Sequence, residues 1–119
     1  MARNAPSIDA YGGGGFRLDG VRHDGSLLIV GDAPQAWAVR DLADLTPARL
    51  RPVLDAGRAE VEFLLLGVGA RNAQPPREVR DALRQAGIGL EFMDTPGAAQ
   101  LYNVLTSEGR RLAAALIAI

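Results

Sequence analysis

The sequence lacks cysteine and lysine altogether, and its 119 residues include a single histidine, His23. Without cysteine, a disulfide framework, a thiolate zinc site, an iron–sulfur cluster and a cysteine nucleophile are all excluded. Without lysine, the chain offers no Walker A motif, no Schiff base and no Ser–Lys dyad. One histidine cannot form a metal site that needs two or three, so we expect no bound metal and no cofactor.

An excess of positive charge is missing as well. All 13 basic residues are arginine, 14 residues are acidic, and the formal net charge is −1. Domains that bind nucleic acid normally carry a basic face, so we expect no nucleic-acid partner.

The chain also has no long apolar run. The longest, LAAALIAI at 112–119, is far shorter than the ~20 residues that a membrane-spanning helix needs. The first ten residues contain Arg3 and Asp9 and no apolar stretch typical of a signal peptide. We therefore expect no direct membrane insertion and a cytoplasmic location.

What is present is the composition of a globular protein, with 48% hydrophobic residues in a length typical of one domain. Residues 1–11 show no periodicity and are predicted to be a loose N-terminal lead-in. Residues 12–119 are predicted to form a single α/β domain. Its first part has Asp-Gly pairs between short apolar segments at 16–18, 21–23 and 26–30, which predicts an antiparallel meander.

After Gly31 the pattern changes to alternating helices and strands. Short apolar segments bounded by glycine predict strands, and Thr-Pro or Pro-Pro pairs ahead of amphipathic segments predict helix starts. The expected strands are 36–39, 61–66, 88–93 and 112–119, and the expected helices are 46–57, 75–87 and 95–107. Three helix–strand alternations imply right-handed crossovers and a mainly parallel central sheet flanked by helices.

In such a sheet, ligands usually bind beyond the carboxyl ends of the strands. If 61–66 and 88–93 are parallel neighbours, Gly67, Gly69, Asp94 and Thr95 converge at one edge. The free N–H groups after Thr95 would then offer an anion site at a helix N-terminus. The alternative is structural: Thr95 caps the helix and the glycines make tight turns.

Two further residues lie within the same predicted helix. Asn103 follows Tyr102, and asparagine inside a helix usually has a hydrogen-bonding reason to be there. Either Asn103 ties the helix to an adjacent loop, or it faces a pocket together with Asp94. The sequence shows no nucleophile with a positioned base, so no catalytic residue is assigned and no enzyme activity is expected.

Several segments together resemble a small family in order and spacing. They are GGGGFRLDGVRHDGSLLIV at 12–30, LLLGVGA at 64–70, GIGLEFMDTPGAAQLYNVLTSEGR at 87–110 and LAAALIAI at 112–119. The family resembled is that of domain of unknown function 498, the Mth938-like domain, which includes a mitochondrial respiratory complex I assembly factor and a mammalian adipogenesis-associated protein. That family more often has threonine where this chain has Leu101.

The resemblance implies a single three-layer α/β domain without an established catalytic activity. By analogy it implies protein partners, among them respiratory or membrane-assembly proteins. The leading hypothesis is therefore a non-enzymatic accessory protein that acts through protein contacts, in assembly of respiratory complex I or another membrane complex.

The alternative hypothesis is a protein that binds a small molecule or anion with Gly67, Gly69, Asp94, Thr95, Tyr102 and Asn103. The oligomeric state stays open. A homodimer through Trp37 and an edge of the meander is one possibility, and inward packing of the same residues is the other.

Overall fold

The computed structural model describes residues 5–119. Eight strands are present: β1 (Ile8–Gly12), β2 (Gly15–Leu18), β3 (Val21–Asp24), β4 (Ser26–Val30), β5 (Ala33–Trp37), β6 (Phe63–Gly67), β7 (Gly89–Met93) and β8 (Leu112–Leu116). The α-helices are α1 (Arg51–Glu60), α2 (Arg77–Gln85) and α3 (Thr95–Ser107), and single 3₁₀ turns form at Leu42–Asp44 and Pro47–Leu50. Among these residues, no helix combines the length and apolar character needed to cross a bilayer.

The central sheet has five strands in the order β5-β4-β8-β6-β7. β6 runs parallel to both β7 and β8, whereas β4 runs antiparallel to β8 and to β5. The predicted neighbours β6 and β7 are therefore confirmed as parallel, with Phe63 opposite Gly89 and Gly67 opposite Met93. The parallel core is as predicted, and two antiparallel strands complete the sheet on one side.

The N-terminal meander forms a second sheet of three antiparallel strands, in the order β1-β2-β3. The predicted meander differs from this at both ends. Residues 8–11, predicted as part of a loose lead-in, form most of β1, whereas residues 1–4 of that lead-in lie outside the described residues. The segment 26–30, predicted as the last strand of the meander, is β4 of the central sheet, where it pairs with β5 and β8.

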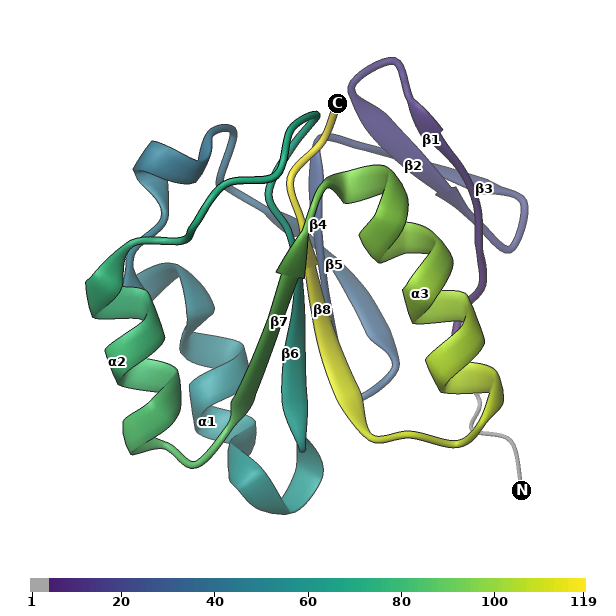
Figure 1. Cartoon of the computed structure of the whole chain (residues 1–119). Coiled ribbons are helices and arrows are strands. Elements are labelled where there is room, and N and C mark those ends of the chain that lie inside the picture. The colour runs from purple at the N-terminus through teal and green to yellow at the C-terminus, as the bar shows by residue number, and fades with distance from the viewer. Residues whose placement is uncertain (1–4) are drawn as a thin grey trace.

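The molecule has three layers, as Figure 1 shows. Helices α1 and α2 cover one face of the central sheet, and α3 with the three-stranded sheet covers the other. The family-based expectation of a three-layer α/β fold is confirmed. β8 lies in the middle of the sheet and is buried along its whole length, which explains its uncharged sequence Leu-Ala-Ala-Ala-Leu.

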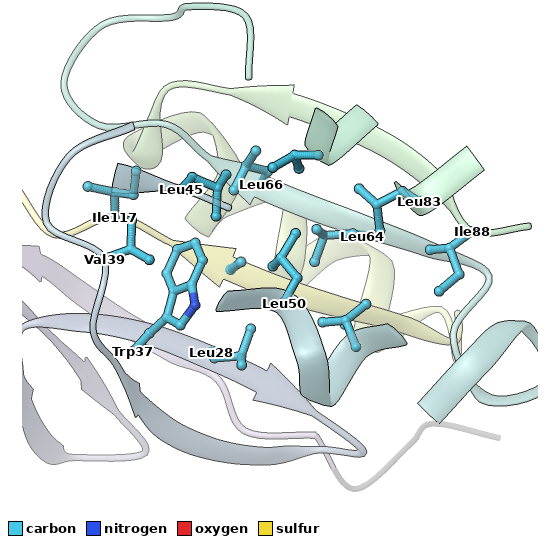
Figure 2. Close-up of a cluster of buried hydrophobic side chains, with 14 of the residues drawn as sticks. Leu28, Trp37, Val39, Leu45, Leu50, Leu64, Leu66, Leu83, Ile88 and Ile117 are labelled. Carbon is cyan, nitrogen blue, oxygen red and sulfur yellow. The ribbon is translucent and has the colours of Figure 1, made fainter. Parts of the chain in front are cut away.

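Two apolar clusters hold the layers together, one on each face of the sheet. Alternate residues of a strand point to opposite faces, so Leu64 and Leu66 pack toward α1 and α2 while Leu65 packs toward α3. Figure 2 shows the first cluster, where Trp37 lies among Leu28, Val39 and Leu50.

The predicted helix 46–57 is replaced by a 3₁₀ turn at Pro47–Leu50 followed by α1. Pro52 lies in the first turn of α1. Proline fits there because the first N–H groups of a helix have no partner inside it. Gly57 interrupts α1 with a φ of 73°, so the last residues before β6 continue past a kink.

Candidate functional site

The carboxyl ends of β6, β7 and β8 are joined around the side chain of Thr95. Its hydroxyl accepts a hydrogen bond from the Gly69 N–H at 3.0 Å and donates one to the Ile117 carbonyl at 2.7 Å. The Thr95 N–H donates to the Gly69 carbonyl at 2.8 Å, and the Ile117 N–H donates to the Gly67 carbonyl at 2.9 Å. Thr95 is fully buried, so one threonine, which itself follows β7, supplies polar partners to two other chain segments where water has no access.

Gly67 shows how closely these ends approach one another. A Cβ atom placed on Gly67 would lie 3.0 Å from the Thr95 Oγ1 and 3.0 Å from a Leu116 methyl carbon. Gly67 is therefore needed because the side chains of Thr95 and Leu116 occupy the space beside it. From the sequence, Gly67 was expected to line a ligand-binding edge of the sheet. In the structure, its lack of a side chain allows Thr95 and Leu116 to pack against the backbone.

The N-terminus of α3 already has an anion of its own. Asp94, not Thr95 as the sequence suggested, is the N-cap residue, and its Oδ1 accepts a hydrogen bond from the Gly97 N–H at 2.8 Å. The carboxylate takes the position that an external anion would use at the positive end of the helix. Asp and Thr are both good N-cap residues, so the local pattern does not distinguish Asp94 from Thr95 as the cap.

Asn103 and Tyr102 lie farther along α3 and serve another contact. The Asn103 Oδ1 accepts from the Ile8 N–H at 2.9 Å, and its Nδ2 donates to the Ile8 carbonyl at 2.8 Å. Asn103 thus ties the helix to strand β1, which agrees with the first of its two sequence-based alternatives, although the tie is to a strand. Tyr102 is 1% exposed and packs in the cluster beneath α3.

The six candidate residues therefore separate into two structural groups, with Gly67, Gly69, Asp94 and Thr95 in one and Tyr102 and Asn103 in the other. The predicted convergence of the first group is confirmed. Binding of a small molecule or anion by these residues stays a prediction, and what the structure supplies at this edge is close packing. Asn103 lines a small hollow of about 170 Å³ together with Ser7 and Thr106, and two larger hollows are lined by other residues.

These two larger hollows were not identified from the sequence. One is an open groove of about 470 Å³ between α2 and β7, in which Leu90 and Phe92 lie beside Arg80 and Arg84. The other, of about 510 Å³, is more polar and includes Arg40 and Arg49. The alternation Leu90-Glu91-Phe92 predicts a strand with one apolar face, but no local sequence pattern indicates that this strand lies at an edge of the sheet.

The structure shows whether the Trp37 side chain packs inward or is available for a homodimer. Its ring is 7% exposed, and its Nε1–H donates to the Arg49 carbonyl at 2.8 Å. Trp37 therefore packs inward, and a dimer through this side chain has no exposed surface to use.

Comparison with known proteins gives the chain its relatives. Residues 8–117 match the sequence model of a family described as a protein of unknown function (DUF498/DUF598). An uncharacterised protein of Rhodobacter capsulatus is 43% identical over 110 residues, which cover 92% of this chain and 82% of that protein. The human NADH dehydrogenase [ubiquinone] 1 alpha subcomplex assembly factor 3 is 33% identical over 116 residues, which cover 98% of this chain and 62% of the human protein.

Solved structures agree with this relationship. The crystal structure of an outer membrane protein from Bartonella henselae has a TM-score of 0.90 at 31% identity, covering 99% of this chain and 98% of that one. A protein of Bordetella parapertussis has a TM-score of 0.86 at 32% identity, and both chains are covered completely. The structure named MT938 shares the fold, with a TM-score of 0.65 at 13% identity over 96% of this chain and 98% of that one.

Proposed function

This chain belongs to the DUF498/DUF598 family, and from that premise we propose that it is a non-enzymatic accessory protein that acts through protein contacts in the assembly of respiratory complex I or of another membrane complex. One observation carries the proposal. Nearly the whole chain aligns with relatives named as assembly factors of NADH dehydrogenase, although it spans less than two thirds of the human protein's length. We place its action in the cytoplasm, at the surface of the membrane complex that it serves.

The use of the polar groups at the strand ends supports a role through surface contacts. Thr95, Asp94 and Asn103 each bond to backbone groups of the chain through hydrogen bonds of 3.0 Å or less. These bonds give each of the three side chains a role inside the fold, which does not require them to be polar groups held ready for a substrate. An assembly factor needs no such groups, because it works by holding partners in place.

The test is deletion of the gene in the source organism, followed by native-gel separation of membrane complexes and measurement of NADH-driven quinone reduction. We expect less assembled complex I and lower activity, both restored by the wild-type gene. An affinity-tagged chain should capture respiratory or membrane-assembly proteins that the tag alone does not capture. Normal assembly in the deletion strain, with no such partner captured, would overturn the proposal, and fractionation of the same cells locates the chain.

A further inference from the structure

Strand β7 forms one edge of the central sheet. Within residues 5–119, β7 is the last strand of its sheet and pairs with β6 alone. Figure 1 shows it at the front of the sheet, with α2 on one side and α3 on the other. An edge strand presents unpaired N–H and C=O groups to which an extended segment can add.

The hydrogen bonds of β7 show which of its backbone groups face outward. The Gly89 N–H donates to the Glu62 carbonyl, and the Met93 carbonyl accepts from the Val68 N–H, so both residues bond toward β6. Backbone direction alternates along a strand. The N–H and C=O groups of Leu90 and Phe92 therefore point to the open edge.

The same two residues line the groove between α2 and β7. We define the β7–α2 groove by Arg80, Leu83, Arg84, Ile88, Leu90 and Phe92. Leu83 and Ile88 are buried beneath it, at 1% and 3% exposure, while Leu90 and Phe92 are half-buried. A strand added at the edge would place every second side chain over this apolar surface, because alternate residues of a strand share one face.

The charges at the rim of the groove select the partner. Arg80 and Arg84 line the β7–α2 groove and no carboxylate does. Arg84 forms an ion pair with Asp81, whereas the described residues provide no ion pair for Arg80. Glu91 is exposed but alternates to the other face of β7. An apolar segment that also carries a carboxylate would therefore complement the groove.

The other strand edges are less suited to this role. β5 contains Pro34, which has no N–H to donate, and four of its five residues are exposed. The Ile8 N–H and C=O of β1 are already bonded to Asn103. β3 is four residues long and includes the charged side chains of Arg22 and Asp24. β7 alone among these described edges joins outward backbone groups to a neighbouring apolar groove.

We propose that the β7–α2 groove docks an extended segment of a partner protein, which adds as a strand to β7 and carries apolar residues alternating with at least one carboxylate. This inference rests on the proposed function and identifies the surface through which the chain would bind its partner protein. A second copy of the chain fits less well. Two β7 strands related by a twofold axis would bring the Arg80 and Arg84 side chains of both copies together, with no carboxylate lining the groove to balance them.

The experiment uses the full-length chain in the source organism, with the photoreactive residue benzoylphenylalanine replacing Arg80, which leaves Arg84 as the cation of the rim. In a second chain it replaces Phe92, which leaves both arginines in place. A matched chain has it in place of Gln35, which is exposed on the opposite edge strand β5. After irradiation, mass spectrometry identifies the crosslinked peptide. We expect adducts from positions 80 and 92, not from position 35, with an extended apolar segment containing Asp or Glu, from a respiratory or membrane-assembly protein.

Charge reversal then tests the rim. With benzoylphenylalanine at position 80, Arg84→Glu should lower the adduct yield about fivefold, the size expected from about 1 kcal/mol for an exposed ion pair. Arg77→Glu is the matched control, because Arg77 is exposed on the same helix and does not line the groove. In the isolated complex, slower amide exchange at Leu90 and Phe92 should accompany the adduct.

The outcomes separate this inference from the proposed function. An acidic extended segment of a protein unrelated to membrane complexes at position 80 would support the docking surface and overturn the proposed function. A respiratory partner crosslinked from position 35 and not from position 80 or 92 would overturn the docking surface only. Adducts between two copies of the chain at position 80 or 92, or no adduct from either position, would also overturn it.

Discussion

The packing around Thr95 predicts a large loss of stability when its hydroxyl is removed. Thr95→Val keeps the shape of the side chain, so it opens no cavity. It does remove the acceptor of the Gly69 N–H and the donor to the Ile117 carbonyl, both in a fully buried place. A buried polar group left without a partner costs about 1–3 kcal/mol. The two groups together therefore predict a loss of about 2–5 kcal/mol in the free energy of unfolding.

The matched control is the same substitution at Thr106, near the other end of α3. The Thr106 hydroxyl donates to the Tyr102 carbonyl at 2.7 Å. That carbonyl also accepts the regular i→i−4 bond of the helix, so it keeps a partner when the hydroxyl is lost. We expect Thr106→Val to cost less than about 1 kcal/mol.

The assay is urea unfolding followed by the fluorescence of Trp37, together with calorimetric melting. For a chain of this length, each kcal/mol lowers Tm by about 4 °C, so Thr95→Val should lower it by about 8–20 °C. Thr95→Ser retains the hydroxyl and should recover most of the loss. If Thr95→Val and Thr106→Val lowered stability equally, the idea that Thr95 satisfies the strand ends would be wrong.

Three further predictions concern the same framework. Asn103→Leu removes both bonds to Ile8 and should cost about 1–3 kcal/mol, with faster amide exchange in β1 and little change in the central sheet; unchanged exchange at Ile8 would contradict this. Gly67→Ala should cost about 1–3 kcal/mol in urea unfolding because its Cβ would lie 3.0 Å from Thr95 and Leu116, and a neutral result would show that those neighbours can move. Millimolar inorganic phosphate should raise Tm by less than about 1 °C, since the Asp94 carboxylate already caps α3, and a larger rise specific to phosphate would revive the anion-site hypothesis.

The fold was largely predictable where its signals are local. The apolar segment ending at Gly67, the Asp-Thr-Pro start of α3 and the uncharged final strand each predict an element from neighbouring residues. Strand β1 was not predictable in this way, because its pairing depends on β2 and on Asn103, which lies 95 residues from Ile8 in the sequence. Likewise, nothing local tells that residues 26–30 leave the meander and pair with β8.

The position of the candidate site could be predicted from the sequence, but the contacts that fill it could not. Alternating helices and strands place the ends of β6 and β7 together, and the structure confirms this. Whether the space between them is open depends on which side chains pack into it, here those of Thr95 and Leu116 beside Gly67. Thr95 turns its hydroxyl inward to Gly69 and Ile117, a choice that the sequence does not record. The groove beside β7 was missed for a related reason, since strand order decides which strand has a free edge.

The filled strand ends and the open edge of β7 both follow from the strand order. The chain leaves β6 through α2 on one face, forms β7, and then returns through α3 on the other face to β8, which lies on the far side of β6. Ligand crevices of α/β sheets form where the strand order reverses in this way, here between the ends of β6 and β8. The connection from β7 through α3 to β8 must cross β6, so Thr95, at the start of α3, lies over the strand ends. The hydrogen bonds of its hydroxyl close the crevice there. Because the return adds β8 on the far side, no later strand covers β7. The usual ligand crevice of this chain is thus packed by its own residues, while the edge of β7 has no further strand beside it, and these two observations are the reason for proposing that the chain recognises another polypeptide.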